Sequence, residues 1–309
     1  LQKFGAKIKL SNKNNLPLTI MGSSNLKPIK YFEKKGSAQC KSSVMLAALN
    51  TKGTTFIKAK KSRTHTEILF KNLKLSIKVK KQKNFDFIKV KGGKSIRPLN
   101  YSIPSDISSC AFFIVLAALS KNSFLRIKNV NINSSRTGIL EILKLMGISI
   151  GIKRKKIYKG EKVADLIIRS KETIKPINCP KKLNSAAIDE FLLIFLVSAK
   201  AKGISYFKDL SELNQKESPR LLWGAKILNK MGIKTVLTKN SIKIYGNPSI
   251  QVKKDIIIKN FLKDHRVFMS SVVAALVFGG KWKIFDKDSI KTSFPTFISK
   301  IKSLGAIIT

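Results

Sequence analysis

Two short stretches of the sequence place acids and cations close enough together for proton transfer on a charged substrate. Residues 216–220 read KESPR, which puts an acid and two cations within about one helical turn. Residues 264–266 read DHR and group three kinds of ionisable side chain. General acid–base catalysis on an anion needs an acid, a base and cations that offset the negative charge. The two stretches therefore predict chemistry on an anionic substrate, unless each is only a salt-bridged surface patch.

Arginines recur at corresponding places, at the start of segments that we expect to be helices. Only eight of the 61 basic residues are arginine; Arg63, Arg136 and Arg220 occupy equivalent positions, and Arg266 follows Asp264. Helix N-termini attract anions through free N–H groups and the helix dipole. A guanidinium adds a two-pronged donor for carboxylate or phosphate. The pattern favours small anionic ligands.

A second recurring set begins another group of expected helices. Serine and aspartate accept hydrogen bonds from the first free N–H groups of a helix, so capping is the simplest interpretation of each. The set consists of Ser37, Asp106, Asp189 and Asp264.

The sequence does not indicate a metal or redox site. The only histidines are His65 and His265, and the three cysteines, at positions 40, 110 and 179, are too widely spaced for a zinc site or a disulfide framework. No phosphate loop, Ser-His-Asp triad or dinucleotide motif is present. We therefore expect no metal and no cofactor. Scattered cysteines are also typical of a reducing compartment such as the cytoplasm.

The charge of the chain is strongly one-sided. Its 309 residues include 61 Lys+Arg against 17 Asp+Glu, for a formal net charge of +44. A nucleic-acid-binding protein is one alternative. Against it, lysine far outnumbers arginine, basic residues are spread over the whole chain, and aromatic residues are not interleaved with basic runs. We favour a solvent-facing lysine background, with nucleic acid an unlikely partner.

The apolar content predicts a packed core rather than a membrane span. Hydrophobic residues make up 43% of the chain. The longest apolar runs, Ala111–Leu119 and Phe191–Ala199, are much shorter than the roughly 20 residues that cross a bilayer. We expect no membrane partner.

Four internal repeats organise the chain. Each contains a polar cap, an apolar helix, a short strand, an amphipathic helix and a further strand, and the second helices end near Gly147, Gly232 or Gly305. Hairpins are expected at 148–168 and 233–245. This repeated order of helices and strands predicts an α/β protein built by duplication. The repeats span residues 36–79, 105–150, 188–236 and 263–308.

The spacing of the repeats also predicts two domains. Residues 92–104, rich in glycine and proline, separate a domain at 1–103 from a three-repeat domain at 104–309. Residues 1–10 match the end of a repeat, so we expect the chain to begin inside a fifth copy and to be the C-terminal part of a longer protein. Residues 1–4 should then be the tail of a helix, and the first domain should expose apolar surface.

Six motifs in order resemble the 5-enolpyruvylshikimate-3-phosphate (EPSP) synthase family, in the form often called class II. The resemblance covers essentially the whole chain and implies two inside-out α/β domains of repeated β-α-β-α-β-β units, the first one truncated here. It also implies a monomer when full length, and an inactive fragment. The motifs are GSAQ at 36–39, SRTHTE at 62–67, IDE at 188–190, KESPR at 216–220, DHR at 264–266 and TSFP at 292–295.

The resemblance implies a cofactor-free transfer of the enolpyruvyl group of phosphoenolpyruvate to the 5-hydroxyl of shikimate 3-phosphate, with release of phosphate, in aromatic amino acid biosynthesis. It assigns Asp189 as the base, Glu217 as the acid and Lys216 as a bridge between the substrates. The residues implied for shikimate 3-phosphate are Ser37, Ala38, Gln39, Ser62, Arg63, Asp189 and Lys216; those for phosphoenolpyruvate are Gln39, Arg220, His265 and Arg266.

Two positions depart from the family pattern, which usually has aspartate in place of Thr64 and of Pro219. The change at Pro219 puts the direction of Arg220 in question, although proline suits the first turn of a helix. The alternatives are the related UDP-N-acetylglucosamine enolpyruvyl transferase, a degenerate inactive copy and the nucleic-acid-binding protein.

Overall fold

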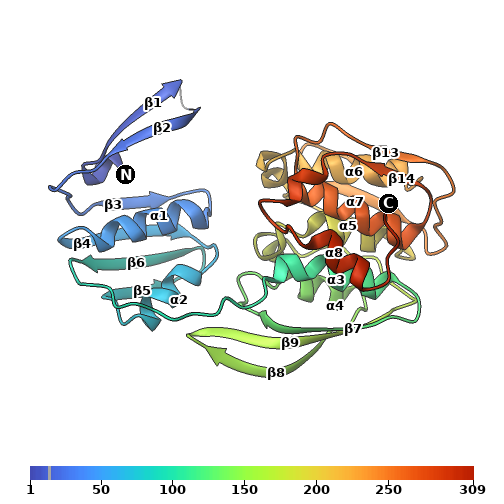
Figure 1. The fold of residues 1–309 in the computed structure, drawn as a ribbon, viewed down its shortest axis with the longest axis horizontal. Coiled ribbons are helices and arrows are strands. Elements are labelled where there is room, and N and C mark those ends of the chain that lie inside the picture. Colours follow the sequence, from blue (N-terminus) through green and yellow to red (C-terminus); the bar gives the residue numbers. More distant parts are fainter. Residues whose placement is uncertain (13–14) are drawn as a thin grey trace. The chain divides into compact units, whose positions relative to one another are not determined.

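The computed structural model describes residues 1–12 and 15–309, which form two compact units. Unit 1 contains Leu1–Ile103 together with Ile157–Lys162, and unit 2 contains Pro104–Lys156 together with Val163–Thr309. Figure 1 shows the helices and strands of both units, which are described separately below. None of the helices in the described part of the chain is both long and apolar enough to cross a membrane.

Unit 1 is a four-stranded sheet with two helices packed on one of its faces. The strands lie in the order β3-β4-β6-β5; β3 runs parallel to β4, and the other pairs are antiparallel. Alternate side chains of β4 and β6 are buried with the helices in one apolar core. The elements are β3 (Lys30–Glu33), α1 (Ala38–Leu49), β4 (Gly53–Lys60), α2 (His65–Asn72), β5 (Ile77–Lys81) and β6 (Phe85–Gly92).

A short helical turn and a hairpin precede this sheet. The 3-10 turn Gln2–Phe4 ends at Gly5, whose φ of 113° is a left-handed conformation, and β1 (Lys7–Asn12) pairs antiparallel with β2 (Asn15–Met21). The expected order of helix end, glycine and strand is therefore present. Ile20 and Met21 are exposed on β2.

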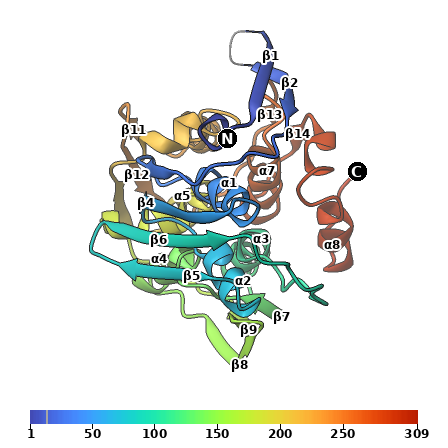
Figure 2. The same ribbon diagram turned by 90° about the vertical axis from the view of Figure 1, so that its left-hand side faces the viewer.

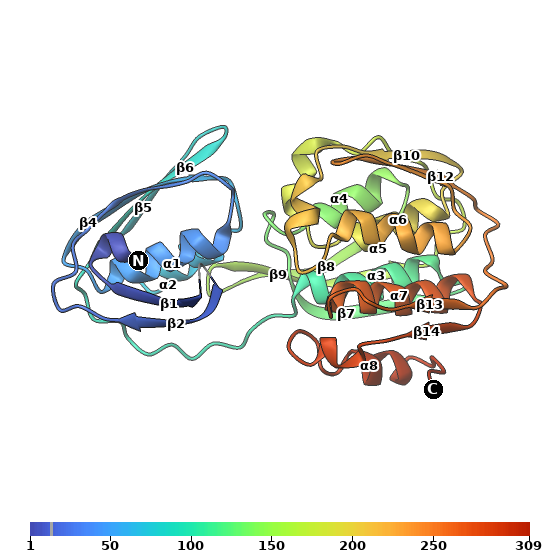
Figure 3. The same ribbon diagram turned by 90° about the horizontal axis from the view of Figure 1, so that it is seen from above.

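Unit 2 is built from three helix pairs with sheets on the outside. The first helix of each pair, α3, α5 or α7, is largely buried, as expected from its apolar sequence. Strands β10 (Gly203–Phe207) and β12 (Ile242–Gly246) lie on one side of these helices and β13 (Ile256–Ile258) and β14 (Trp282–Ile284) on another (Figure 3). The helices are α3 (Ile107–Leu119), α4 (Gly138–Leu145), α5 (Phe191–Ala199), α6 (Arg220–Lys230), α7 (His265–Phe278) and α8 (Phe297–Ser303).

The sheets of unit 2 are short and follow the repeats. Their orders are β7-β9-β8, β10-β12-β11 and β13-β14, so both expected hairpins form. The tip of the β8–β9 hairpin belongs to unit 1. The strands are β7 (Phe124–Asn131), β8 (Gly151–Tyr158), β9 (Glu161–Arg169), β10 (Gly203–Phe207), β11 (Thr235–Leu237), β12 (Ile242–Gly246), β13 (Ile256–Ile258) and β14 (Trp282–Ile284).

The helix ends agree with the sequence in most places. Gly147, Gly232 and Gly305 follow α4, α6 and α8 with φ of 88°, 90° and 96°. The strand expected after α8 is not formed; residues 306–309 have no regular structure. The mixed α/β fold and the repeated unit are confirmed.

Three of the four expected helix caps are confirmed and one is wrong. Ser37 Oγ accepts from Cys40 N at 3.2 Å, and Asp106 and Asp264 cap α3 and α7 in the same way. Asp189 does not cap α5, because Glu190 occupies the N-cap position and a 3-10 turn precedes it. The carboxylate of Asp189 is instead directed toward cations.

Candidate active site

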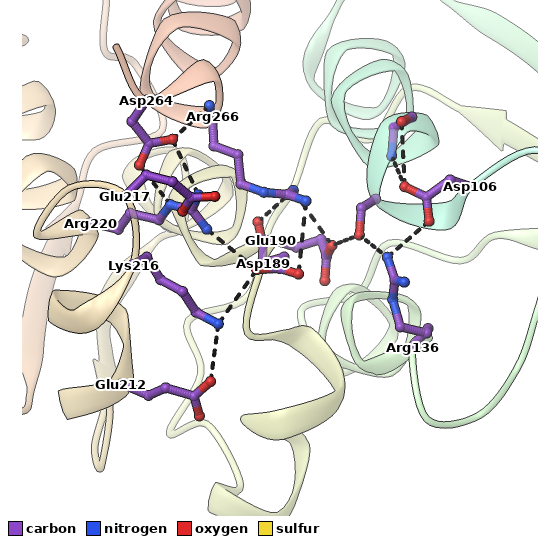
Figure 4. Close-up of polar contacts among 12 residues, drawn as sticks. Asp106, Arg136, Asp189, Glu190, Glu212, Lys216, Glu217, Arg220, Asp264 and Arg266 are labelled. Carbon is purple, nitrogen blue, oxygen red and sulfur yellow. Dashed lines mark hydrogen bonds and ion pairs between the residues drawn. The ribbon is translucent and has the colours of Figure 1, made fainter. Parts of the chain in front are cut away.

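The N-termini of α3, α5 and α7 bring a connected set of acids and cations together in unit 2. Figure 4 shows this set, with Asp106, Asp189 and Asp264 each at or next to the start of one buried helix. Arg220 and Arg266 approach Asp189 from the starts of α6 and α7. Groups that are distant in the sequence thus meet because the repeats place their helix starts at one end of the unit.

Arg220 and Asp264 form the most buried ion pair of this set. The side chain of Arg220 is 2% exposed and that of Asp264 is 0% exposed. Arg220 Nε donates to Asp264 Oδ2 at 2.8 Å and Nη2 donates to Oδ1 at 3.2 Å. Ser218 Oγ and the backbone N–H of Arg266 also donate to this carboxylate, at 2.8 and 2.9 Å. The guanidinium is therefore fixed by a two-pronged contact.

These contacts determine the acidity of Asp264. Burial by itself would raise its pKa, but the hydrogen bonds and charge of Arg220, with the bonds from Ser218 and Arg266, lower the pKa below its usual value. Asp264 remains an anion that orients Arg220, rather than a group that exchanges protons near neutral pH.

Pro219 does not misdirect Arg220. It occupies the N-cap position of α6 with φ of −71°, and Arg220 is the first residue of the helix. Arg220 Nη1 reaches Asp189 Oδ1 at 3.3 Å, while Nη2 also donates to Glu217. The outer edge of the guanidinium therefore faces the two residues expected to be base and acid.

Asp189 is surrounded by cations. Besides Arg220, Lys216 Nζ lies 3.9 Å from Oδ1, and Arg266 Nη2 lies 3.8 Å from Oδ2. Arg266 Nη1 also donates to the backbone carbonyl of Asp189 at 3.0 Å. A carboxylate held in this way can accept a proton from a substrate hydroxyl, while the neighbouring cations attract the substrate's negative groups.

Glu217 and Lys216 are the more accessible members. The Glu217 side chain is 54% exposed, so it can reach a ligand from its position beside Arg220. Lys216 is oriented by Glu212, whose Oε1 lies 3.0 Å from Nζ. Glu212 was not among the residues predicted from the sequence, although its i,i+4 spacing from Lys216 is a recognisable signal.

The sequence singled out Asp106 and Arg136 but did not predict the contacts that join them to a second arm of the network. Ser108 Oγ donates to the buried Glu190, and Arg136 Nη2 donates to Ser108 at 2.6 Å and to Asp106 at 2.9 Å. Burial raises the pKa of Glu190 and Asp189 adds to the rise, whereas the charge of Arg266, the hydrogen bond from Ser108 and the charge of Arg136 oppose it. Arg136, which lies between β7 and α4, thus supports the network through contacts with the start of α3 and is not one of the residues around Asp189.

His265 lies at the first position of α7, beside these charges. Burial and the charge of Arg266 lower its pKa below the usual 6.5, with Arg220 contributing and Asp264 and Glu217 opposing the shift. The imidazole is therefore neutral at neutral pH and can exchange hydrogen bonds with a ligand.

The depressed pKa of His265 predicts a pH-dependent contribution to stability. The unfolded chain binds this proton near pH 6.5, whereas the folded chain binds it only at lower pH. The free energy of unfolding should therefore decrease as the pH is lowered from about 8 to about 5, and His265→Gln should make that decrease smaller. Urea denaturation of both proteins across this range measures the difference. An equal fall in the variant would contradict the prediction.

The remaining predicted residues lie in unit 1, at the start of α1 and in the loop before α2. Ser37, Ala38 and Gln39 form the first turn of α1, while Ser62 and Arg63 follow β4. Thr64 precedes α2 without a capping bond from its side chain.

A buried ion pair that the sequence did not predict joins these two segments. Lys41, only 1% exposed, lies with its Nζ 2.6 Å from Glu67 Oε1 and donates to the backbone carbonyl of Arg63 at 2.7 Å. The pair thus links α1 to the loop that carries Ser62 and Arg63, and it fixes the backbone there. Lysine and glutamate are almost never fully buried unless they are paired.

The described residues contain no group of three His, Cys, Asp or Glu side chains able to hold a metal ion. Arginine, lysine, serine and glutamine supply donors for oxyanions in both units. The six predicted residues of unit 2 (Asp189, Lys216, Glu217, Arg220, His265 and Arg266) form one neighbourhood, and the five of unit 1 (Ser37, Ala38, Gln39, Ser62 and Arg63) lie on two adjoining segments.

Comparison with solved structures defines the class of protein. The chain superposes with a TM-score of 0.84 on an EPSP synthase from Acinetobacter baumannii, at 34% identity, covering 98% of this chain and 68% of that one. The enolpyruvyl transferase NikO from Streptomyces tendae shares the fold, with a TM-score of 0.75 at 17% identity. The fold is that of the enolpyruvyl transferases.

Sequence comparison places the chain within this class. The family model for EPSP synthase (3-phosphoshikimate 1-carboxyvinyltransferase) matches residues 1–301. Proteins named 3-phosphoshikimate 1-carboxyvinyltransferase from Ruthia magnifica and Hydrogenovibrio crunogenus are 40% and 36% identical, and the chain covers 68% and 69% of their lengths. The chain belongs to the EPSP synthase family, transferases of the shikimate pathway, and the predicted family and reaction class are confirmed.

Proposed function

We propose that this chain carries the residues that transfer the enolpyruvyl group from phosphoenolpyruvate to the 5-hydroxyl of shikimate 3-phosphate. The observation that supports the proposal most strongly is the arrangement around Asp189, where a carboxylate lies within 4 Å of nitrogen atoms of Lys216, Arg220 and Arg266. A transfer between two anions requires such a concentration of cations, because the substrates repel each other.

The first step adds the hydroxyl across the double bond of phosphoenolpyruvate. Asp189 accepts the proton of the 5-hydroxyl as its oxygen attacks the substituted carbon, and Glu217 donates a proton to the methylene carbon. In the second step the Glu217 carboxylate takes a proton from the new methyl group as the bond between the substituted carbon and the phosphate oxygen breaks, and the proton held by Asp189 passes to the departing phosphate. Phosphate leaves and the carbon–carbon double bond is restored, so atoms and charges balance.

The binding roles follow from the donors available. Arg220 and Arg266 offer guanidinium groups to the carboxylate and phosphate of phosphoenolpyruvate, with the neutral His265 beside them and Gln39 as a further donor. Lys216 contacts both substrates. Shikimate 3-phosphate is bound by Ser37, Ala38, Gln39, Ser62 and Arg63, where the first turn of α1 offers free backbone N–H groups.

Binding to Arg220 requires an exchange of partners. In the structure its Nη atoms contact Asp189 and Glu217, while Nε and Nη2 contact Asp264. We infer that phosphoenolpyruvate takes over the contacts to Asp189 and Glu217, which releases these groups for proton transfer. The contacts to Asp264 hold the guanidinium plane throughout.

A ligand-induced shift in melting temperature tests the acceptor. The gene product that contains residues 1–309 should be stabilised by shikimate 3-phosphate, by about 2.7 kcal/mol at a concentration of 100 times Kd. Shikimate without its phosphate should stabilise much less, because it cannot use the anion-binding residues. Stabilisation by UDP-N-acetylglucosamine but not by shikimate 3-phosphate would instead support the related transferase.

A further inference from the structure

The solvent-facing side of the unit 1 sheet alternates phenylalanine and lysine. Side chains on a strand point alternately to either face, and Ile57 and Ile88 are buried on the helix side. The opposite face is formed by their neighbours, which we call the Lys–Phe face; Figure 2 shows β4, β6 and β5 lying side by side in this sheet. The face consists of Lys30, Phe32, Phe56, Lys58, Lys60, Lys78, Lys80, Phe85, Phe87, Lys89 and Lys91.

The strand register places the residues of the Lys–Phe face in rows that cross the sheet. One row pairs Phe32 with Lys58, Lys58 with Phe87 and Phe87 with Lys80. The neighbouring row pairs Lys30 with Phe56, Phe56 with Lys89 and Lys89 with Lys78, and a third pairs Lys60 with Phe85. Each ring therefore has at least one lysine directly across from it on the next strand.

The rings are accessible and lie under ammonium groups. Phe32 and Phe56 are 42% and 40% exposed. Lys58 Nζ lies 4.9 Å from the ring centres of Phe32 and Phe85, and Lys89 Nζ lies 5.2 Å from that of Phe56. Cation–π attraction of this kind fixes the ammonium groups beside the rings.

The positive charge of the face is not balanced within these strands. All seven lysines are exposed, whereas the two acids of the four strands, Glu33 and Asp86, are buried on the helix side. A partner for this face must therefore bring negative charge, and it must also gain from covering aromatic rings.

We propose that the Lys–Phe face binds single-stranded nucleic acid, with bases stacked on the phenylalanine rings and phosphates contacted by the lysines. The RNA recognition motif binds single strands in this way, with bases stacked on aromatic residues of a four-stranded sheet, and stacking tolerates any base sequence. A polyanion without bases would gain nothing from the rings. An apolar protein partner would have to bury lysines, which are depleted from interface cores. The proposal is independent of the transferase site.

Fluorescence anisotropy of a labelled single strand of about 12 nucleotides, titrated with this chain, measures the binding. If about four phosphates are contacted, the logarithmic salt slope is about −2.8, so affinity should fall about 50-fold between 50 and 200 mM salt. The double substitution Phe32→Leu and Phe56→Leu should weaken binding about 10-fold or more and leave the salt slope unchanged, because only stacking is lost.

Charge reversal provides the matched control. Lys58→Glu with Lys89→Glu should lower both the affinity and the salt slope. Lys253→Glu with Lys254→Glu makes the same change in net charge at two exposed lysines of unit 2 and should alter affinity less than about 2-fold. The urea midpoint of each variant checks that it folds.

Three results would overturn the proposal. An equal loss in the Lys253/Lys254 control would show that net charge alone attracts the strand. Unchanged affinity in the Phe32/Phe56 variant, with equal competition by inorganic polyphosphate, would show a surface that does not use bases. Absence of binding at about 50 mM salt would dismiss the site altogether.

Discussion

Replacing Asp189 with asparagine is expected to lower kcat by about 10²- to 10⁴-fold, the usual contribution of a positioned proton acceptor. Asparagine keeps the size of the side chain and can still accept the hydrogen bond from Arg220. It cannot take the proton of the attacking hydroxyl. Phosphate release by the gene product that contains residues 1–309, with the concentrations of phosphoenolpyruvate and shikimate 3-phosphate varied, measures the loss, and the KM values should change much less than kcat.

A matched control separates this effect from a change in charge. Asp209 forms an exposed ion pair with Lys181 in unit 2. Asp209→Asn makes the same chemical change away from the network and should leave turnover within about 2-fold, because exposed pairs contribute little. If Asp189→Asn kept kcat within 10-fold of the parent protein, the assignment of Asp189 as the base would be wrong.

Replacing Arg220 with methionine is expected to lower the free energy of unfolding by about 3–5 kcal/mol, because Asp264 would be left buried without its partner. The pair is 2% and 0% exposed, so water cannot replace the guanidinium without opening the structure. Urea denaturation of the whole protein measures the loss of stability. Turnover should also be lost, since the same guanidinium faces Asp189 and Glu217.

A second substitution distinguishes the structural role of Arg220 from its chemical one. In the double variant Arg220→Met, Asp264→Asn, the uncompensated charge is removed, and asparagine can still cap α7 and bind Ser218. Stability should recover in part, whereas turnover should not. A double variant as unstable as Arg220→Met alone would contradict the view that the buried charge of Asp264 causes the loss.

Local signals in the sequence predicted much of the fold. The apolar first helices, the amphipathic second helices and the glycines at 147, 232 and 305 depend on residues a few positions apart, so they could be recognised from the chain alone. The strand expected after α8 was wrong, as was the cap at Asp189. Residues 306–309 have no regular structure, and a 3-10 turn before α5 moves the N-cap from Asp189 to Glu190.

The sequence predicted which residues belong to the candidate site, but it did not predict which of them contact one another. Residues of the KESPR and DHR stretches do lie together around Asp189, and their roles in catalysis stay a prediction. The Arg220–Asp264 pair spans 44 positions and Lys41–Glu67 spans 26, so no local pattern reveals that they are buried partners. The Lys–Phe face was missed for the same reason. Its aromatic and basic residues become neighbours only when the strands pair, so the linear sequence does not show that they share one face.

The most direct test of the proposed function is phosphate release by the gene product that contains residues 1–309, mixed with phosphoenolpyruvate and shikimate 3-phosphate. We expect release that requires both substrates and yields one enolpyruvyl product for each phosphate. A well-folded protein that binds both substrates and releases no phosphate would contradict it.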